Sequence, residues 1–255
     1  MNKTTIQKIL KTLGIKRGTM YDDAIQRLNF HVGCKFKCKY CAPTFQRQMK
    51  RQKQNCIDCY HYVPHLHLDR LEDYLDHTTG DEFIWLGASG DISFCPKDAM
   101  REAVKVTKRN QDRTFFFQTK NPSYFHGFKF PDNVLLCITL ETDKDHIARQ
   151  VSLAPAPSKR IKDFKELDHP HKVITIEPIM TFHLKKMKQI ILDKIKPERV
   201  YIGYDSHPDY SNLIEPRLEK TLALIKAISK HTNVKTKEIR FPHQHQVNLT
   251  QWGVN

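Results

Sequence analysis

Short apolar runs alternate with amphipathic stretches along most of the chain. A run that is apolar throughout is typical of a strand buried on both faces, as in a parallel sheet. Such runs predict strands within segments 83–91, 114–121, 134–142, 172–179 and 199–206. An alternating stretch at 27–32 predicts the first strand, and a short strand-like piece follows at 238–241.

Apolar residues at helical spacing separate these strands and predict helices within segments 4–13, 68–75, 100–107, 184–195 and 218–229. Residues 143–172 are charged, and Pro155 and Pro157 predict an irregular connection at its start. Strands that alternate with helices indicate an α/β fold with a parallel sheet covered by helices. Six such units suit an incomplete (β/α)6 parallel barrel, although the alternation alone equally allows a doubly wound sheet.

The pattern divides the chain into three parts. Residues 1–26 are an N-terminal helix and connection, residues 27–241 the partial barrel, and residues 242–255 a polar tail. An insertion at about 42–80 carries two further cysteines and several histidines. The chain shows no internal repeat and no low-complexity segment.

Composition adds a charge imbalance, with 42 basic residues against 28 acidic ones and a net charge of +14. This balance favours a polyanionic partner, although a basic enzyme with no nucleic-acid role fits it too. No stretch approaches 18 apolar residues, and the N-terminal residues lack the apolar run of a signal peptide. Seven cysteines without a secretion signal indicate a reducing cytoplasm.

The most informative stretch is residues 31–41, which read HVGCKFKCKYC. Cys34, Cys38 and Cys41 are spaced C-x3-C-x2-C, and Tyr40 stands directly before the third cysteine. Three thiolates on one loop after a strand can hold three corners of a 4Fe–4S cube and leave one iron open. Zinc would also accept three sulfurs and one more group. Disulfides are disfavoured because three is odd and no secretory signal precedes the motif.

This loop resembles the signature of radical S-adenosylmethionine (SAM) enzymes. The resemblance implies a partial-barrel fold and a 4Fe–4S cluster on Cys34, Cys38 and Cys41. It also implies that the amino and carboxylate groups of SAM chelate the open iron, and that an electron cleaves SAM to a 5′-deoxyadenosyl radical. An electron donor such as flavodoxin or ferredoxin is implied as a partner.

Polar or glycine residues follow each predicted strand, where parallel α/β folds bind their ligands. They are Gly87, Ala88, Ser89, Gly90 and Asp91, then Thr119 and Lys120, Glu141 and Thr142, Glu177, and last Tyr204, Asp205 and Ser206. Each has an ordinary interpretation as a turn or a solvated residue, but their recurrence at successive strand ends favours a site.

The resemblance assigns these strand ends to SAM. Residues 87–91 occupy the place of the glycine-rich motif that receives the SAM amino group, but they read GASGD rather than the commoner GGE. Asp91 or a backbone carbonyl would therefore substitute for the usual acidic residue. Glu141 matches a position that contacts the ribose hydroxyls, and Lys120 would pair with the SAM carboxylate. Glu177 is the remaining expected contact, stiffened by the Pro178 that follows it.

The order of the motifs GASGD, FQTKNPSYF, LET, IEP and GYDS also resembles a particular branch of this superfamily. That branch consists of phage- and prophage-associated radical SAM-like proteins of uncharacterised activity, distantly similar to spore photoproduct lyase. The match covers residues 27–215 in order.

The insertion contains a second group of metal-ligand side chains. Cys56 and Cys59 form C-x2-C and are followed by His61, His65 and His67. These residues fit a zinc knuckle, ligands of a second cluster, or a loop with merely reduced thiols.

The basic run after the cysteine motif contains Arg47, Lys50, Arg51 and Lys53, and it is either a solvated helix face or a surface that faces phosphates. With the net charge, it favours a nucleic acid or nucleotide as the substrate. The alternative function is a non-catalytic zinc or nucleic-acid binding module.

Two cysteines lie outside both groups. Cys137 sits in an apolar strand and is predicted to be a core residue. Cys95, beside the GASGD turn, is a weaker candidate for a radical-relay thiol.

Overall fold

The computed structural model describes residues 3–13, 21–41, 48–71 and 74–243. Its helices are α1 (Lys3–Thr12), η1 (Lys50–Gln52), α3 (Ile57–His61), η2 (Leu68–Leu71), η3 (Ile92–Phe94), α4 (Lys97–Arg109), η4 (Pro122–Gly127), α5 (Asp145–Val151), α6 (Pro157–Glu166), α7 (Leu184–Gln189), the π-helical turn η5 (Ile190–Ile195), α8 (Pro208–Ser211) and α9 (Leu218–Ile228). Its strands are β1 (Ala24–Leu28), β2 (His31–Val32), β3 (His65–Leu66), β4 (Phe83–Leu86), β5 (Phe115–Thr119), β6 (Val134–Thr139), β7 (Lys172–Ile176), β8 (Arg199–Gly203) and β9 (Asn233–Lys237).

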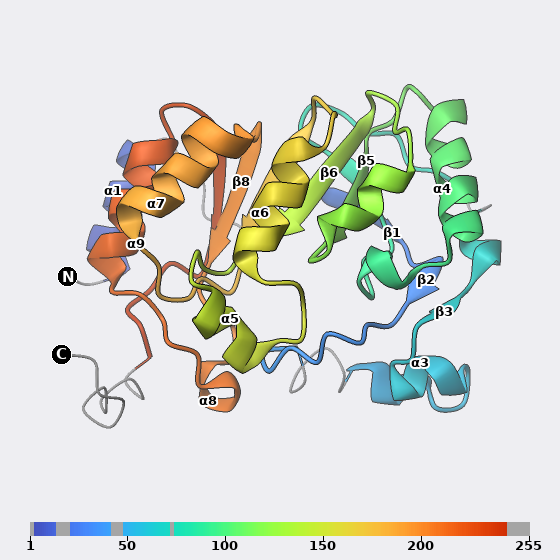
Figure 1. Ribbon diagram of the computed structural model, residues 1–255, viewed down its shortest axis with the longest axis horizontal. Helices are drawn as coiled ribbons and strands as arrows, with labels where there is room; N and C mark the ends of the chain where they lie inside the picture. Colours follow the sequence, from blue (N-terminus) through green and yellow to red (C-terminus); the bar gives the residue numbers. More distant parts are fainter. Residues whose placement is uncertain (1–2, 14–20, 42–47, 72–73, 244–255) are drawn as a thin grey trace.

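The main sheet runs in the order β1-β4-β5-β6-β7-β8-β9, and every neighbouring pair is parallel. Helices α4, α6, α7 and α9 lie along one face of the sheet, and the carboxyl ends of the strands point toward α5 and α8 (Figure 1). A strand order that follows the chain, with helices on one face, is that of an open barrel. The predicted α/β partial barrel is therefore confirmed, and the doubly wound alternative is excluded.

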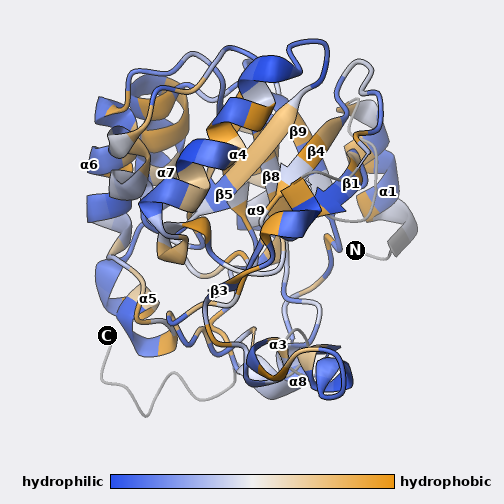
Figure 2. Cartoon of the chain, turned by 90° about the vertical axis from the view of Figure 1, so that its right-hand side faces the viewer, coloured by the Kyte–Doolittle hydropathy of each residue, from blue (hydrophilic) through white to orange (hydrophobic). Residues whose placement is uncertain are grey.

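Strands β4 to β8 bury both faces, which explains their continuous apolar runs. Alternate residues such as Ile84, Phe115 and Phe117 pack under the helices in the main core, together with Met100 and Ala103 of α4. Figure 2 shows the polar side of α4 turned outward and the apolar strands behind it. Helix α1 joins the same core through its apolar side chains.

The concave inner face changes character along the strands. Phe116, Cys137 and Val173 form part of an apolar cluster at its lower level. Two residues further on, the inward positions are Gln118, Thr139 and Thr175, which line a cavity. Because side chains alternate between faces, position i + 2 of each strand returns to the same face nearer its carboxyl end. The inner face thus turns from apolar to polar where the strands end.

An ion network closes the opposite end of the sheet. Arg199 donates to the Asp23 carboxylate over 2.6 Å and to Asp81 over 3.1 Å, and Lys235 lies 3.0 Å from Asp23. Tyr201 donates a further hydrogen bond of 2.5 Å to Asp23. These residues tie the starts of β1, β4, β8 and β9 together, at the end of the fold that usually serves stability.

Several local predictions are wrong. The final strand is β9, not residues 238–241, and Val234 and Thr236 are its buried positions. Its half-buried Lys235 and Lys237 interrupt any apolar run. The charged segment 143–172, for which only an irregular start was expected, contains α5 and α6. Residues 68–75 form only the short helix η2 before residues 72–73, which lie outside the described part.

Within the described residues, no helix has the length and apolar character to cross a bilayer.

The predicted first strand divides into β1, which begins three residues earlier than expected, and β2.

Candidate functional site

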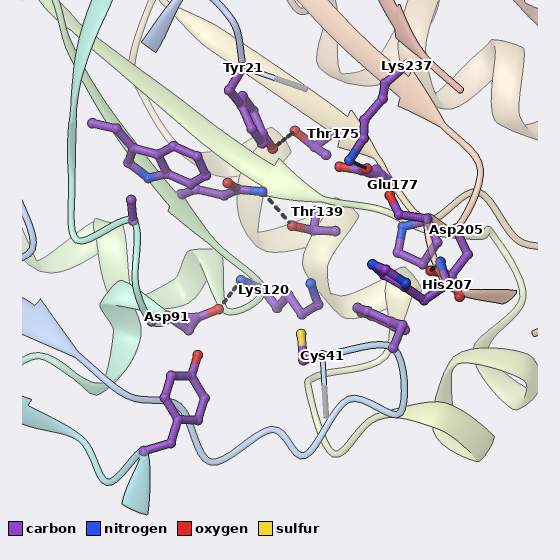
Figure 3. Close-up of a pocket in the computed structure, with 18 residues that line it drawn as sticks. Tyr21, Cys41, Asp91, Lys120, Thr139, Thr175, Glu177, Asp205, His207 and Lys237 are labelled. Atoms are coloured by element: carbon purple, nitrogen blue, oxygen red, sulfur yellow. Dashed lines mark hydrogen bonds and ion pairs between the residues drawn. The ribbon is translucent and has the colours of Figure 1, made fainter. Parts of the chain in front are cut away.

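A cavity of about 330 Å³ opens at the carboxyl ends of the strands. Its volume is near the lower limit of small-molecule sites, roughly 300–1,000 Å³. The strand-end cavity is lined by aromatic rings, three acidic residues and two lysines, as Figure 3 shows for the labelled side chains. Cys41 lies at its edge, so the cavity joins the strand ends to the cysteine motif.

The cysteine loop, residues 33–41, docks on the turn at 87–91. Gly33 pairs with Gly90 as a parallel bridge, its N–H donates to the Ser89 carbonyl over 3.1 Å, and its carbonyl accepts from Asp91 over 3.2 Å. Gly33 has a φ of +100°, a backbone region that favours glycine. The turn after β4 and the cysteine loop are thus joined by backbone hydrogen bonds.

Neighbouring elements hold the far side of the loop. The Phe36 carbonyl accepts from Leu153 N–H over 2.7 Å, and Lys39 N–H donates to the Val151 carbonyl over 2.9 Å. Phe36 also packs on Phe94 with ring centroids 4.7 Å apart. The turn after α5 therefore fixes the loop from the side opposite β4.

The three cysteines belong to one small cluster with these aromatic rings. Cys38 is buried, and its Sγ lies 3.1 Å from Ser152 Oγ. A hydrogen bond from the Cys41 thiol lowers the pKa of Cys38 to about 6, whereas burial raises the pKa of Cys34 to about 12. Three soft sulfur donors gathered on one loop beside a cavity fit an iron–sulfur cluster with an open corner.

Glu141 is the centre of a buried ion network. Its Oε2 accepts from Arg160 over 2.7 Å, its Oε1 lies 3.4 Å from Lys120 Nζ, and Tyr40 donates to it as well. Burial would raise the pKa of Glu141, but the charges of Arg160 and Lys120 hold it well below the usual range. Glu141 thus ties the aromatic residue of the cysteine motif to β6 and α6.

The Lys120 ammonium also faces the motif, 5.3 Å from the centroid of the Tyr40 ring. Burial would lower the pKa of Lys120, but Glu141 and the thiols of Cys38 and Cys41 raise it above the usual range. Lys120 is therefore charged and stabilises thiolates at this loop.

Asp91 is occupied by structural hydrogen bonds. Its Oδ1 caps η3 through Ser93 N–H at 3.0 Å and accepts from Thr119 Oγ1 at 2.6 Å, while Oδ2 accepts from Lys120 N–H at 2.8 Å. The Asp91 carboxylate therefore connects the turn after β4 to the end of β5. Asp91 also lines the cavity.

Glu177 and Asp205 line the opposite wall of the cavity. Glu177 pairs with Lys237 of β9 over 2.9 Å. Burial raises the pKa of Glu177, and the nearby Asp205 adds to the effect. Asp205 accepts a hydrogen bond from Ser211 of α8. This wall carries two carboxylates and one ammonium for a polar ligand.

The turn residues divide between the cavity and the fold. Ala88 and Gly90 line the cavity, whereas Ser89 N–H is held by Asn29 Oδ1 at 2.7 Å. Gly87 has a φ of +76° and a Cβ there would lie 3.0 Å from Ile92 Cδ1. The conformation of the turn therefore requires glycine at position 87, whether or not a ligand binds there.

Gly90→Ala is expected to destabilise the protein by about 1–3 kcal/mol, a typical cost of overpacking. A Cβ there would lie 2.5 Å from the Gly33 carbonyl oxygen, so the cysteine loop must shift. Gly127→Ala is the control, because a Cβ at Gly127 meets nothing within 4 Å. Urea denaturation measures the free energy of unfolding of both variants. Equal values would show that the backbone at Gly33 shifts to accept a Cβ at position 90 without a cost in stability.

The fold also gathers the second group of metal-ligand side chains. Cys56, Cys59, His65 and His67 each place a ligand atom within 4.8 Å of all the others. His61 of the same motif is exposed and lies outside this set.

The two remaining cysteines lie away from the cavity lining. Cys137 is fully buried in β6, which confirms its prediction as a core residue. Cys95 is also buried in the main core, and burial raises its pKa to about 12. Cys95 does not line the strand-end cavity, so its position gives no support to the relay prediction.

Sequence reasoning missed several residues of the site. Arg160 lies in α6, where a charged segment gave no sign of a buried guanidinium. Tyr62, Tyr21 and Trp85 supply cavity walls, and Lys237 comes from the unpredicted strand β9. The inward alternation of β4 could have indicated Trp85, since Trp85 and Phe83 share a face.

Two solved structures of SuiB from Streptococcus suis share the fold. The structure bound to precursor peptide SuiA aligns with 91% of this chain and 53% of its own, at 12% identity and a TM-score of 0.52. The structure bound to S-adenosylmethionine aligns with 92% and 55%, at 12% identity and a TM-score of 0.51.

This chain thus spans about half the length of the SuiB chains. No protein-family model matches the chain, and no curated protein matches it. At 12% identity the likeness establishes the fold, the incomplete parallel barrel expected from the radical SAM resemblance.

Proposed function

We propose that this protein is a radical SAM enzyme that binds a 4Fe–4S cluster through Cys34, Cys38 and Cys41 and SAM in the strand-end cavity. The observation that carries the proposal is the position of Cys41, which closes a three-cysteine loop and lines that cavity. The likeness to SAM-bound SuiB supports it at the level of the fold. When bound, the cluster and SAM would together supply reductive cleavage of a carbon–sulfur bond.

The chain's own residues would bind and orient these groups. Lys120 places a positive charge beside the thiolates and the cavity, where it can also pair with the SAM carboxylate. Glu177, whose Oε1 pairs with Lys237, is the acceptor for the ligand's amino or hydroxyl groups on the opposite wall, because both oxygens of Asp205 already accept hydrogen bonds. The backbone at Ala88 and Gly90 remains the place for the amino group, since the Asp91 oxygens already accept other hydrogen bonds.

Glu141 has a positioning role in this proposal. A ribose contact would have to displace Tyr40 or Lys120, because both occupy Oε1. We therefore assign to Glu141 the orientation of these two side chains, with the ribose contact as the alternative.

Anaerobic reconstitution with iron and sulfide tests the proposal. We expect about four irons per chain at the motif, a brown colour, and release of 5′-deoxyadenosine on reduction in the presence of SAM. A colourless protein that binds zinc at Cys34, Cys38 and Cys41 would instead support the non-catalytic binding module. Flavodoxin or ferredoxin would replace a chemical reductant if either is the electron donor. The phage-associated branch remains a prediction from the order of motifs.

The substrate class we propose is a nucleic acid or nucleotide. Lys50, Arg51 and Lys53 are exposed around η1, while Arg47 lies outside the described residues. Lys50 Nζ lies 4.2 Å from the centroid of the Tyr60 ring, which packs η1 against α3. Because α3 leads into the chain that lines the cavity at Tyr62, a phosphate bound at η1 would lie on the insertion next to the site.

Affinity for labelled DNA or RNA is expected to fall steeply with salt, with a slope near −0.9 per phosphate contact on duplex DNA. Lys50→Glu with Arg51→Glu should weaken binding and make the slope shallower by about 0.9 for each phosphate that is no longer neutralised. The exposed pair Lys162 and Lys165 of α6, reversed in the same way, is the control for net charge. Absence of binding at low salt would favour a peptide substrate, in line with the precursor peptide bound to SuiB.

A further inference from the structure

Cys56, Cys59, His65 and His67 converge at one point on the insertion. Cys59 Sγ lies 3.3 Å from Nε2 of His65 and 3.3 Å from Nε2 of His67, and Cys56 Sγ lies 3.4 Å from Nε2 of His65. The two histidine Nε2 atoms are 2.8 Å apart. Four good ligand atoms therefore surround a single small space.

The sulfur–nitrogen separations are close to those around a single tetrahedral ion, whereas the two Nε2 atoms, 2.8 Å apart, would move to about 3.3 Å on binding one zinc. Zinc binds thiolate sulfur at about 2.3 Å and imidazole nitrogen at about 2.0–2.1 Å, so sulfur and nitrogen ligands on one zinc lie about 3.6 Å apart. The observed sulfur–nitrogen distances of 3.3 and 3.4 Å are close to that value. All four ligand atoms lie within 4.8 Å of one another, which leaves room for one ion and not for an iron–sulfur cube.

The backbone prepares both halves of the set. Cys56 is the N-cap of α3, and its sulfur accepts the Cys59 N–H over 3.4 Å, which turns both thiols the same way. Nδ1 of His65 lies 2.7 Å from the Val63 carbonyl oxygen. Since a carbonyl can only accept, Nδ1 carries the proton and Nε2 presents its lone pair to the other ligands. A hydrogen bond of this kind orients most metal-binding histidines.

We propose that Cys56, Cys59, His65 and His67 bind one structural Zn²⁺. Two thiolates and two imidazoles are a ligand set of zinc sites, and four protein ligands close the coordination sphere. A closed sphere leaves no position for water or substrate, so this zinc holds structure and takes no part in the chemistry.

The zinc would fix a wall of the strand-end cavity. The Cys/His knuckle, residues 56–67, pairs with β2 through β3, in the register His31↔Leu66 and Val32↔His65. Pro64 packs on the backbone of Gly33, where even a Cβ would lie 2.5 Å from its nitrogen. Tyr62 lies between the two halves of the ligand set and lines the cavity. The ion would therefore hold Tyr62 against the site and brace the strand that leads into the cysteine loop.

Metal analysis of the full-length protein, purified without chelator and before iron reconstitution, tests the proposal. We expect about one zinc per chain in the wild type and less than about a tenth of that in Cys59→Ser and in His67→Ala. Cys95→Ser is the matched control, because Cys95 is buried but lies outside the set. Zinc that is absent from the wild type, or retained fully by both variants, would overturn the proposal.

Two further measurements separate this site from the proposed cluster and from misfolding. Cys34, Cys38 and Cys41 changed together to Ala should keep the zinc, whatever becomes of SAM cleavage. Cobalt-substituted wild type should show the intense visible bands of a tetrahedral site with thiolate ligands, a readout that needs no variant to fold. Octahedral cobalt spectra, or iron in place of zinc at this site in the purified wild type, would contradict the proposal.

Discussion

Changing any one of Cys34, Cys38 and Cys41 to Ala is expected to remove the iron–sulfur absorption and reduce 5′-deoxyadenosine release to background. A cube held by three protein thiolates has no spare ligand, so losing one leaves two irons without protein sulfur. The four other cysteines have other places: Cys95 and Cys137 are buried in the core, and Cys56 and Cys59 belong to the Cys/His knuckle. Iron content and visible absorption after anaerobic reconstitution measure the effect.

Cys137→Ala is the control for removal of a buried thiol. It should keep the full cluster, because Cys137 lies in the inner-face core, where its Sγ is 3.3 Å from Thr175 Oγ1, and it does not line the cavity. If all three motif variants kept a full cluster, the ligand assignment would be wrong. If only one of the three variants lost the cluster, the cysteines changed in the other two would not be required ligands.

The strands could be predicted because burial on both faces leaves continuous apolar runs such as those of β5 and β6. Strand β9 could not, because it lies at the sheet edge and its half-buried lysines pair with acids on other strands, Lys235 with Asp23 and Lys237 with Glu177. Helix α6 was missed for a similar reason: it buries Arg160, whose charge is matched only by Glu141 on another element. Apolar periodicity does not reveal a buried charge whose partner is distant in sequence.

The site shows the same division. The cysteine motif and the polar strand ends are local in sequence, and the structure brings Cys41, Lys120 and Glu177 to one cavity. The roles of Asp91 and Gly90 could not be predicted locally, because each is fixed by a segment remote in sequence. Asp91 is held by the end of β5, and Gly90 faces Gly33. The sequence offered three histidines, His61, His65 and His67, as ligands in the knuckle. The structure selects two of them, because His65 and His67 lie beside the cysteines and His61 does not.

The Glu141 carboxylate contributes both to the stability of the fold and to the arrangement of the candidate site. Its carboxylate neutralises Arg160, whose side chain is fully buried, and Lys120, which is 14% exposed. Arg160 also donates to the Thr139 and Pro155 carbonyls, so it cannot leave for solvent without breaking three hydrogen bonds. Removing the Glu141 charge would leave two buried cations that repel each other beside the cysteine loop.

Glu141→Gln is therefore expected to lower the free energy of unfolding by about 3–5 kcal/mol at pH 7, the usual cost of leaving a buried charge unpaired. Glu102→Gln is the matched control, since Glu102 is exposed on α4 and its pair with Lys105 should contribute less than about 1 kcal/mol. Urea denaturation followed by circular dichroism measures both variants. Equal stabilities for the two would mean that Arg160 and Lys120 find other partners.

The effect should also depend on pH in one direction. The pKa of Glu141 is held well below its usual range in the folded protein, because Arg160 and Lys120 outweigh the effect of burial. An unfolded glutamate titrates near pH 4.3, so the stabilisation by Glu141 is fully present above about pH 5 and is lost as the pH falls toward the folded pKa. The difference in free energy of unfolding between wild type and Glu141→Gln should thus narrow progressively below about pH 4. A difference that stays constant from pH 7 to pH 3 would show that the carboxylate charge does not carry the effect, and that Gln fails through packing or hydrogen bonding to Tyr40 instead.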